Sequence, residues 1–267
     1  MSALIVALGL IVALAFATWL VSLWQRDVSI VDGMWPVFIA SAGFGYAVMA
    51  PPPGVAGIAA LALLAGWAVR LCVHITLRNH GQPEDRRYQK IRANNQPHFR
   101  FKSLYLVFGF QALLAWIVAL PFVAIVELHD FGVLSLLAVM IAAFGIVFEA
   151  VADAQLERFR KNPANRGRVL DTGLWRYSRH PNYFGECCVW WGFGLMALTT
   201  GAWWALASPL LMTLLLLKVS GVTLLEKDIG ERRPEYARYV REVNAFVPGR
   251  PRAGSAAVPI NKGGPTP

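Results

Sequence analysis

The polar run at residues 173–186 has the composition of a ligand-binding motif. It contains Arg-His-Pro-Asn-Tyr and stands directly before a long apolar stretch. Pro181 disfavours the α conformation at His180 and suits the first position of the following helix. The backbone amides of Asn182 and Tyr183 then lie at a helix N-terminus, where they attract anions or carboxamides. His180 on its own would equally suit a capping or interfacial role.

Ionisable residues also recur inside apolar stretches, where each is costly and usually faces a protein interior or a water-filled cavity. Two sets follow i, i+4, i+8 spacing, which puts each set on one helix face. They are Arg70, His74 and Arg78, and Glu149, Asp153 and Glu157. One interpretation is that the basic and acidic stripes pair and hold helices together. The other is that they surround a polar ligand.

Four ionisable groups favour the second interpretation, in which polar residues surround a ligand. Asp153, Arg160, Glu186 and Lys218 belong to three different apolar stretches but are expected at similar depth, next to basic loops. The excess of Arg suits phosphate oxygens, which the planar guanidinium binds bidentately. The sequence has no Walker loop and no GxGxxG motif, so a cofactor must be held between helices rather than by an ordinary nucleotide-binding fold.

The elements that position these groups are membrane helices. Of the 267 residues, 56% are hydrophobic and 15% are charged, which leaves too few polar residues to cover a water-soluble globule. The net charge of +9 would suggest nucleic acid in a soluble protein, but here it first indicates asymmetric loops, and no nucleic-acid partner is expected. The three cysteines, two of them adjacent, exclude a disulfide framework, a CxxC redox site and structural zinc, so no metal is expected.

Seven apolar stretches are long enough to cross a bilayer. They cover residues 3–24, 30–50, 55–77, 103–127, 132–156, 184–200 and 203–225. Lys and Arg concentrate in alternate connections, so the positive-inside rule places the N-terminus outside and the C-terminus in the cytoplasm. The prediction is an all-α integral membrane protein with seven transmembrane helices, in the cytoplasmic membrane if the chain is bacterial.

The chain is predicted to form one membrane domain over residues 1–248. Residues 249–267 are rich in turn formers and have no apolar period, so they are expected to be a disordered tail. The basic connection at 78–102 mixes both charge signs with aromatic residues, a composition that can fold over a ligand or a neighbouring element.

These motifs resemble the steroid 5-alpha-reductase family, specifically its short bacterial membrane branch, over about residues 25–248. The family's NADPH-binding positions resemble, in order and spacing, Asp153, Arg160, Arg168, Tyr177, Arg179, His180, Asn182, Tyr183, Glu186 and Lys218. The family's Asn-x-Gly-x-Pro loop resembles residues 79–83, which adds Gln82 to the expected cofactor site. The resemblance implies a seven-helix fold, NADPH entering from the cytoplasm and a lipid-like substrate entering from the bilayer.

The resemblance also implies a carbonyl-binding pair, for which this chain offers Asp32 and Tyr88. Asp32 stands where the family has a Glu in the second span, and Ile75 stands where it has a Tyr, so Tyr88 is the substitute. Asp32 is expected to stay a neutral acid in its apolar span and to donate a hydrogen bond, beside the tyrosine hydroxyl. The alternative is that Asp32 caps the second helix together with Ser29 or Asp27.

The expected reaction is the NADPH-dependent reduction of a carbon–carbon double bond conjugated to a ketone, such as the Δ4 bond of a 3-oxosteroid. In this interpretation Asn182, Tyr183 and Glu186 hold the nicotinamide carboxamide. Arg160, Arg168, Arg179 and Lys218 hold the phosphates. The alternative is an S-adenosylmethionine-dependent methyltransferase of the isoprenylcysteine type, which shares the Arg-His-Pro-x-Tyr motif. A non-enzymatic scaffold or lipid carrier explains the hydrophobicity but not the charged residues between 153 and 186.

Overall fold

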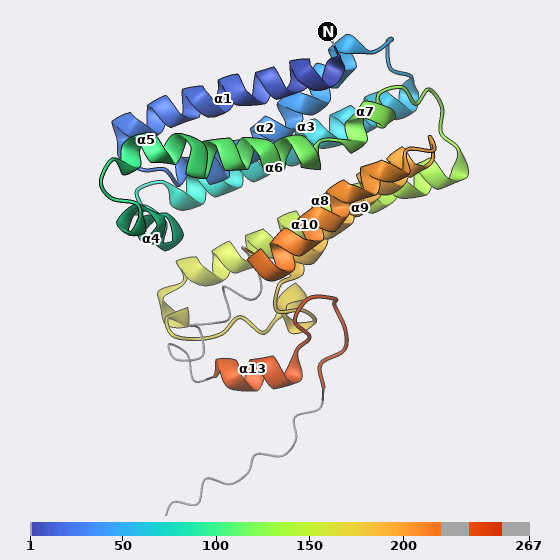
Figure 1. The fold of residues 1–267 in the computed structure, drawn as a ribbon. Coiled ribbons are helices and arrows are strands. Elements are labelled where there is room, and N and C mark those ends of the chain that lie inside the picture. Colours follow the sequence, from blue (N-terminus) through green and yellow to red (C-terminus); the bar gives the residue numbers. More distant parts are fainter. Residues whose placement is uncertain (1, 220–234, 253–267) are drawn as a thin grey trace, which may run out of the picture. The chain divides into compact units, whose positions relative to one another are not determined.

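The computed structural model describes residues 2–219 and 235–252, and these form helices without strands (Figure 1). The first three long helices are α1 (Ala3–Gln25), α2 (Ile30–Met49) and α3 (Val55–Asn79). In sequence order, α1 packs on α2 and α2 packs on α3. The predicted spans at 3–24, 30–50 and 55–77 therefore correspond to real helices, with boundaries within two residues of the prediction.

The basic connection after α3 contains a helix of its own, α4 (Arg86–Asn94). The next helical run covers residues 99–125 and consists of α5 (Phe99–Ser103), the π-helical η1 (Leu104–Gly109), α6 (Phe110–Val118) and α7 (Pro121–Ile125). This run begins four residues before the predicted start at 103. The earlier start follows from amphipathic spacing, because Phe99 and Ser103 are buried whereas the basic Arg100 between them is exposed.

The later helices are α8 (Val133–Lys161), α9 (Pro181–Leu198) and α10 (Ala207–Leu214). Short helical turns flank them: η2 (Pro163–Asn165), η3 (Gly173–Arg176), η4 (Trp203–Leu206), the π-helical η5 (Leu215–Val219) and α13 (Tyr236–Glu242). Helix α9 begins at Pro181, as its proline predicts, and not at 184. Part of the seventh predicted span, residues 220–225, lies outside the described residues.

The chain divides into two compact units. The first contains Met1–Val147 and Gly185–Leu215, and the second contains Phe148–Phe184 and the described part of Leu216–Pro267. Residues 1–248, which were expected to form one membrane domain, contribute to both units. Residues 249–252 belong to the second unit and are attached to it, because the Gly249 amide donates to Tyr177 O at 2.9 Å and the Arg252 amide donates to Glu242 O at 2.8 Å. The expected tail is therefore ordered at its start, and residues 253–267 lie outside the described residues.

Among the described residues, four helical segments are long and apolar enough to cross a membrane: Ala3–Gln25, Val55–Asn79, Phe99–Ile125 and Val133–Lys161. Large apolar side chains on them are exposed, including Leu77 at 70% and Val133 at 78%, which suits contact with lipid. Helices α2 and α9 have 20 and 18 residues but fall outside this group. The fold is that of a multi-pass helical membrane protein, and the number of seven spans and the orientation of the termini stay predictions.

Close backbone packing holds α8 against α9 within the first unit. A Cβ atom on Gly192 would lie 2.6 Å from Ala142 N and 2.7 Å from Ala138 O. A Cβ atom on Gly145 would lie 2.6 Å from Gly185 O. Only glycine allows the two helices to approach this closely.

Candidate functional site

The predicted pair Asp32 and Tyr88 is in direct contact in the first unit. Asp32 lies in the first turn of α2, and Tyr88 lies in α4 and is 5% exposed. The Tyr88 hydroxyl donates to Asp32 Oδ1 at 2.6 Å. The other carboxylate oxygen, Oδ2, accepts from Arg87 Nη2 at 2.7 Å. Two residues 56 positions apart in the sequence thus meet in one hydrogen-bonded group.

Helix α4 is placed by polar contacts at its start. Asp85 is its N-cap and accepts from the Arg87 backbone amide at 2.8 Å, which satisfies a donor of the first turn. The Asp85 carboxylate also accepts from Arg87 Nε at 3.0 Å, so Arg87 links Asp85 to Asp32. Glu84 ties the same segment to the start of α2, since its Oε1 accepts from the Val28 amide at 3.0 Å. These contacts explain why the mixed-charge connection folds.

Electrostatics keep the proton on Tyr88. Burial raises the pKa of the Tyr88 hydroxyl above its ordinary value of 10.0, and the charge of Asp32 and the hydrogen bond to Asp32 raise it further. Partial burial raises the pKa of Asp85, but its hydrogen bonds with Arg87 and the charge of Arg87 outweigh this effect and lower it. The hydroxyl of Tyr88 is therefore a protonated hydrogen-bond donor next to fixed charges.

The structure shows Asp32 as an acceptor of hydrogen bonds, not as a donor. Its Oδ1 accepts from Tyr88 at 2.6 Å and its Oδ2 accepts from the Arg87 guanidinium at 2.7 Å. Within this group Tyr88 is the donor and Asp32 the acceptor. The capping alternative does not apply to Asp32 either, because the side chain of Asp27 accepts from the Ser29 amide at 2.8 Å and from the Ser29 hydroxyl.

In the second unit, the cofactor residues predicted around the start of α9 partly come together. Asn182 Nδ2 donates to Asp153 Oδ1 at 3.1 Å, which joins α9 to α8. The rings of His180 and Tyr183 are stacked, with centroids 5.6 Å apart and an interplanar angle of 5°. His180 and Asp153 are buried, and Asn182 is half-buried.

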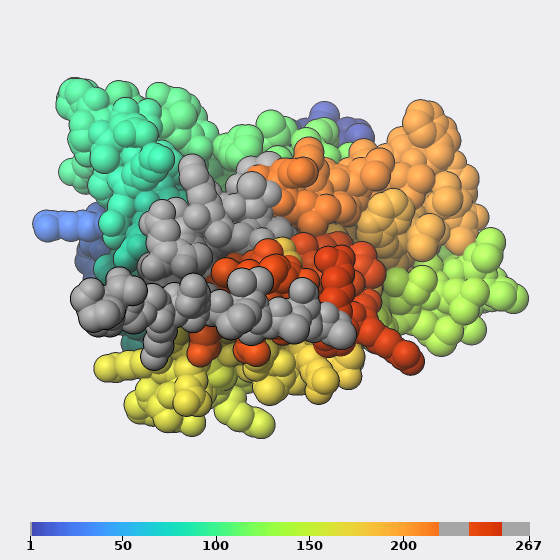
Figure 2. Space-filling view, turned by 90° about the horizontal axis from the view of Figure 1, so that it is seen from below, coloured from blue at the N-terminus to red at the C-terminus, as the bar shows by residue number. Residues whose placement is uncertain are grey.

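Arg179 has a structural contact that the sequence did not predict. Its Nη1 donates to Val243 O at 2.7 Å and to Val240 O at 3.1 Å, at the end of α13. The last carbonyls of a helix have no backbone amide within the helix to bond with. Arg179 supplies donors to them and so stabilises the end of α13. Its predicted role in binding phosphate does not explain these contacts. Figure 2 shows the described C-terminal segment, in red, beside the yellow segment that precedes α9.

The remaining cations of the predicted cofactor site are exposed. Arg160, Arg168 and Lys218 all belong to the second unit, and their charged groups can reach a ligand in solvent. Tyr177 is 44% exposed. Exposed guanidinium groups are able to bind phosphate oxygens.

Two predicted cofactor residues, Gln82 and Glu186, belong to the first unit. Gln82 is exposed in the loop after α3. Glu186 is buried, and its two oxygens accept from the indoles of Trp67, at 2.7 Å, and Trp190, at 3.0 Å. The two rings pack edge to face with centroids 5.0 Å apart. The Glu186 carboxylate thus has a structural role in the core, apart from any contact with a carboxamide.

Sequence reasoning missed Arg87, which joins the two carboxylates beside Tyr88. The signal was present in Asp85-Arg86-Arg87-Tyr88, because an N-cap carboxylate two residues before an arginine can bind both its amide and its side chain. No group of three or more His, Cys, Asp or Glu within residues 2–219 and 235–252 could hold a metal ion.

The family model described as "Protein of unknown function (DUF1295)" matches residues 18–243. The chain belongs to this family. It is a membrane protein family related to steroid 5-alpha-reductase, which supports the resemblance seen in the sequence at this coarser level. The chain is also 26% identical over 287 aligned residues to Uncharacterized protein C594.04c of Schizosaccharomyces pombe, a match that covers 91% of this chain and 79% of the yeast protein. No solved structure matches the chain.

Proposed function

We propose that the protein is an NADPH-dependent reductase that acts on the carbon–carbon double bond of an apolar conjugated enone. Our specific proposal for the substrate is a 3-oxosteroid with a Δ4 double bond. The observation that carries the proposal is the 2.6 Å hydrogen bond between Tyr88 and Asp32, the two residues that the resemblance suggested as the carbonyl-binding pair. Membership in a family related to steroid 5-alpha-reductase agrees with this chemistry.

The role of Tyr88 is to stabilise charge on the carbonyl oxygen. When a hydride adds to the β-carbon, C5 of a 3-oxosteroid, the electron pair of the double bond moves toward the ketone and an enolate oxygen develops. A protonated hydroxyl that turns from Asp32 to donate to that oxygen lowers the barrier, because it stabilises the developing charge. The α-carbon, C4, then takes a proton and the ketone is restored.

Asp32 and Arg87 position that hydroxyl. The carboxylate fixes the Tyr88 side chain through Oδ1, and Arg87 fixes the carboxylate through Oδ2. A substrate ketone that approaches Tyr88 competes with Asp32 for the hydroxyl proton, and the guanidinium compensates the carboxylate when this bond weakens. The pair Asp32–Arg87 thus supports the donor without itself reacting.

The second unit carries the residues that would hold NADPH. Bound NADPH supplies the hydride. The exposed charges of Arg160, Arg168 and Lys218 would bind its phosphates, and the Asn182 amide, held by Asp153, would meet its carboxamide. We propose that this site faces the cytoplasm, as the distribution of Lys and Arg predicts.

An apolar hollow in the first unit suits a lipid-like substrate. It has a volume of about 250 Å³ and lies between α2 and α3, where its lining includes Val37, Phe44 and Cys72. Its lining surface contains no polar atoms. A flat hydrocarbon body can enter such a hollow from the bilayer without leaving polar groups unsatisfied.

The experiment is a comparison of ligand-induced thermal stabilisation of the detergent-purified protein. A ligand that binds the folded state raises the unfolding temperature. We expect NADPH to stabilise the protein and S-adenosylmethionine to have no effect. Stabilisation by S-adenosylmethionine alone would replace the reductase with a methyltransferase. A folded protein that neither cofactor stabilises would exclude both enzymes.

A further inference from the structure

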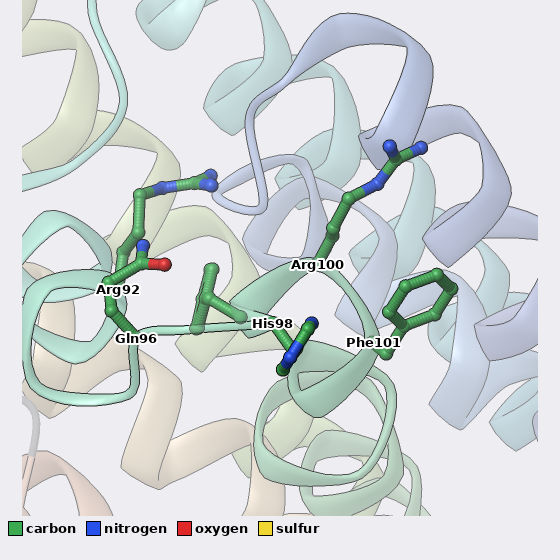
Figure 3. A pocket seen from close by; sticks show the side chains of 6 residues that line it. Arg92, Gln96, His98, Arg100 and Phe101 are labelled. Carbon is green, nitrogen blue, oxygen red and sulfur yellow. The ribbon is translucent and has the colours of Figure 1, made fainter.

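A polar hollow lies between α4 and α5, apart from the group around Tyr88. It has a volume of about 310 Å³ and is lined by Arg92, Gln96, His98, Phe99, Arg100 and Phe101. Figure 3 shows the side chains of Arg92 and Gln96 on one side, those of Arg100 and Phe101 on the other, and His98 between them. The lining residues thus carry two guanidinium groups and an amide, although the Arg100 side chain extends away from Arg92 in this view. Such donors suit an anion with several oxygens.

Arg92 is held in place at this hollow. Its Nε and Nη2 donate to the Glu84 carboxylate at 2.9 and 2.7 Å, and its Cζ lies 4.7 Å from the centre of the Phe99 ring. The hydrogen bonds with Glu84 raise the pKa of Arg92, so it stays charged. These contacts use Nε and Nη2 and leave the Nη1 donors for a ligand.

Arg100 supplies a second positive charge and, in contrast to Arg92, it is not paired with a carboxylate of the described residues. Its side chain is exposed, and within the described part of the chain no carboxylate pairs with it. The only aromatic contact of its guanidinium is with Phe101, at 5.8 Å, among the described residues. Residues 84–102 contain six Lys and Arg against two acidic residues, so the hollow lies in a segment with a net charge of +4. This field attracts anions.

The hollow adjoins the start of a segment that could cross a membrane. Phe99 begins a helical run long and apolar enough to cross a membrane, and Phe101 and Tyr105 at its start are 60% and 61% exposed. The end of α1 lies alongside, because Trp19 Nε1 donates to Arg100 O at 3.0 Å and Arg92 Nη2 donates to Arg26 O at 3.3 Å. Exposed aromatic residues at the ends of spans mark the level of lipid headgroups.

We propose that this hollow binds the phosphate of an acidic phospholipid headgroup. Arg92 and Arg100 contact the phosphate oxygens, Gln96 donates to the remaining headgroup oxygens, and the exposed Phe101 meets the acyl chains. Basic pockets beside transmembrane helices are suited to such headgroups, and an acidic lipid adds attraction that a zwitterionic lipid lacks. The site does not depend on the proposed reductase activity.

The test measures the affinity of the detergent-purified full chain for short-chain phosphatidylglycerol, with phosphatidylcholine of the same chain length and inorganic phosphate as comparison ligands. The variants are Arg100→Gln and the control Lys90→Gln, which removes one exposed charge from α4 outside the hollow. Arg100→Gln should fold normally, because no hydrogen bond of its side chain is lost. An unchanged unfolding temperature without lipid checks this.

We expect Arg100→Gln to weaken phosphatidylglycerol binding about fivefold and Lys90→Gln to leave it unchanged. Phosphatidylcholine should bind more weakly than phosphatidylglycerol to the wild type. Equal losses in both variants would show general attraction by the basic segment and overturn the site. Equal binding of the two lipids, or inorganic phosphate binding as tightly as phosphatidylglycerol, would overturn the assignment to an acidic lipid.

Discussion

Replacement of Tyr88 by Phe removes the proposed hydrogen-bond donor and little else. The variant keeps the ring that is buried in α4 and loses only the hydroxyl that donates to Asp32 at 2.6 Å. Arg87 still donates to the second oxygen of Asp32, so the carboxylate keeps a charged partner. The substitution therefore tests the chemistry of one oxygen atom.

The expected loss follows from the role of a single donor to a developing oxyanion. Removing such a donor lowers kcat by about 10²–10³, or about 2.7–4 kcal/mol of transition-state stabilisation. Stability should fall by about 1–3 kcal/mol, because one oxygen of Asp32 loses a hydrogen bond in a mostly buried place. NADPH binding should not change, because Tyr88 is not among the residues expected to bind the cofactor.

The assay follows NADPH absorbance during reduction of a Δ4-3-oxosteroid by wild type, Tyr88→Phe and the control Tyr105→Phe. Tyr105 is 61% exposed and its hydroxyl makes no hydrogen bond with the described residues, so its variant should turn over normally. Thermal stabilisation by NADPH shows that each variant is folded and binds the cofactor. A kcat for Tyr88→Phe within about threefold of wild type would refute the role of Tyr88.

Three further predictions concern pH, the core and the helix packing. Because the pKa of Tyr88 is raised, its hydroxyl keeps its proton as pH rises. The value of kcat should therefore stay level from about pH 7 to about pH 9.5. A fall of kcat between these pH values would contradict the role of Tyr88 as a donor. Glu186→Gln should destabilise the protein in thermal unfolding by about 1–3 kcal/mol, because an amide offers only one accepting oxygen to the indoles of Trp67 and Trp190. The control Glu127→Gln changes an exposed carboxylate and should have no effect. Gly192→Ala should lower the free energy of unfolding by about 1–3 kcal/mol, because its Cβ would meet backbone atoms at 2.6–2.7 Å. The control Gly66→Ala has nothing within 4 Å of its Cβ, so it should be neutral or stabilise the protein by about 0.5–1 kcal/mol. Equal effects of the two substitutions would argue against close packing of α8 and α9.

The sequence predicted most of the long helices because apolar length is a local property. The first three spans match α1, α2 and α3 closely, and Pro181 marks the first residue of α9. The short helices α4 and α13 were not predicted, because both are short, contain several charged residues and depend on particular contacts. In α4 these are the Asp85 cap and the bonds of Arg87 and Tyr88 to Asp32, which a hydropathy pattern does not contain.

The sequence suggested which residues form the candidate site, and the structure shows contacts that the sequence did not predict for several of them. Asp32 and Tyr88 were selected from the sequence and they meet, yet Asp32 accepts hydrogen bonds where it was expected to donate one. Arg179 and Glu186 were assigned to the cofactor, whereas their described contacts are to the end of α13 and to Trp67 and Trp190. The partner of a polar side chain depends on tertiary packing, so residue type and spacing alone do not determine its role.

The most direct test of the reductase proposal is product analysis with isotopically labelled cofactor. The detergent-purified protein is incubated with a Δ4-3-oxosteroid and NADPH that carries deuterium at the transferred position, and the steroid is examined by mass spectrometry. We expect a product that has gained one deuterium, at C5, and one solvent proton, at C4. An unchanged steroid with a folded, NADPH-binding protein would contradict the steroid substrate, and transfer of a methyl group from S-adenosylmethionine to an added acceptor would contradict the reductase itself.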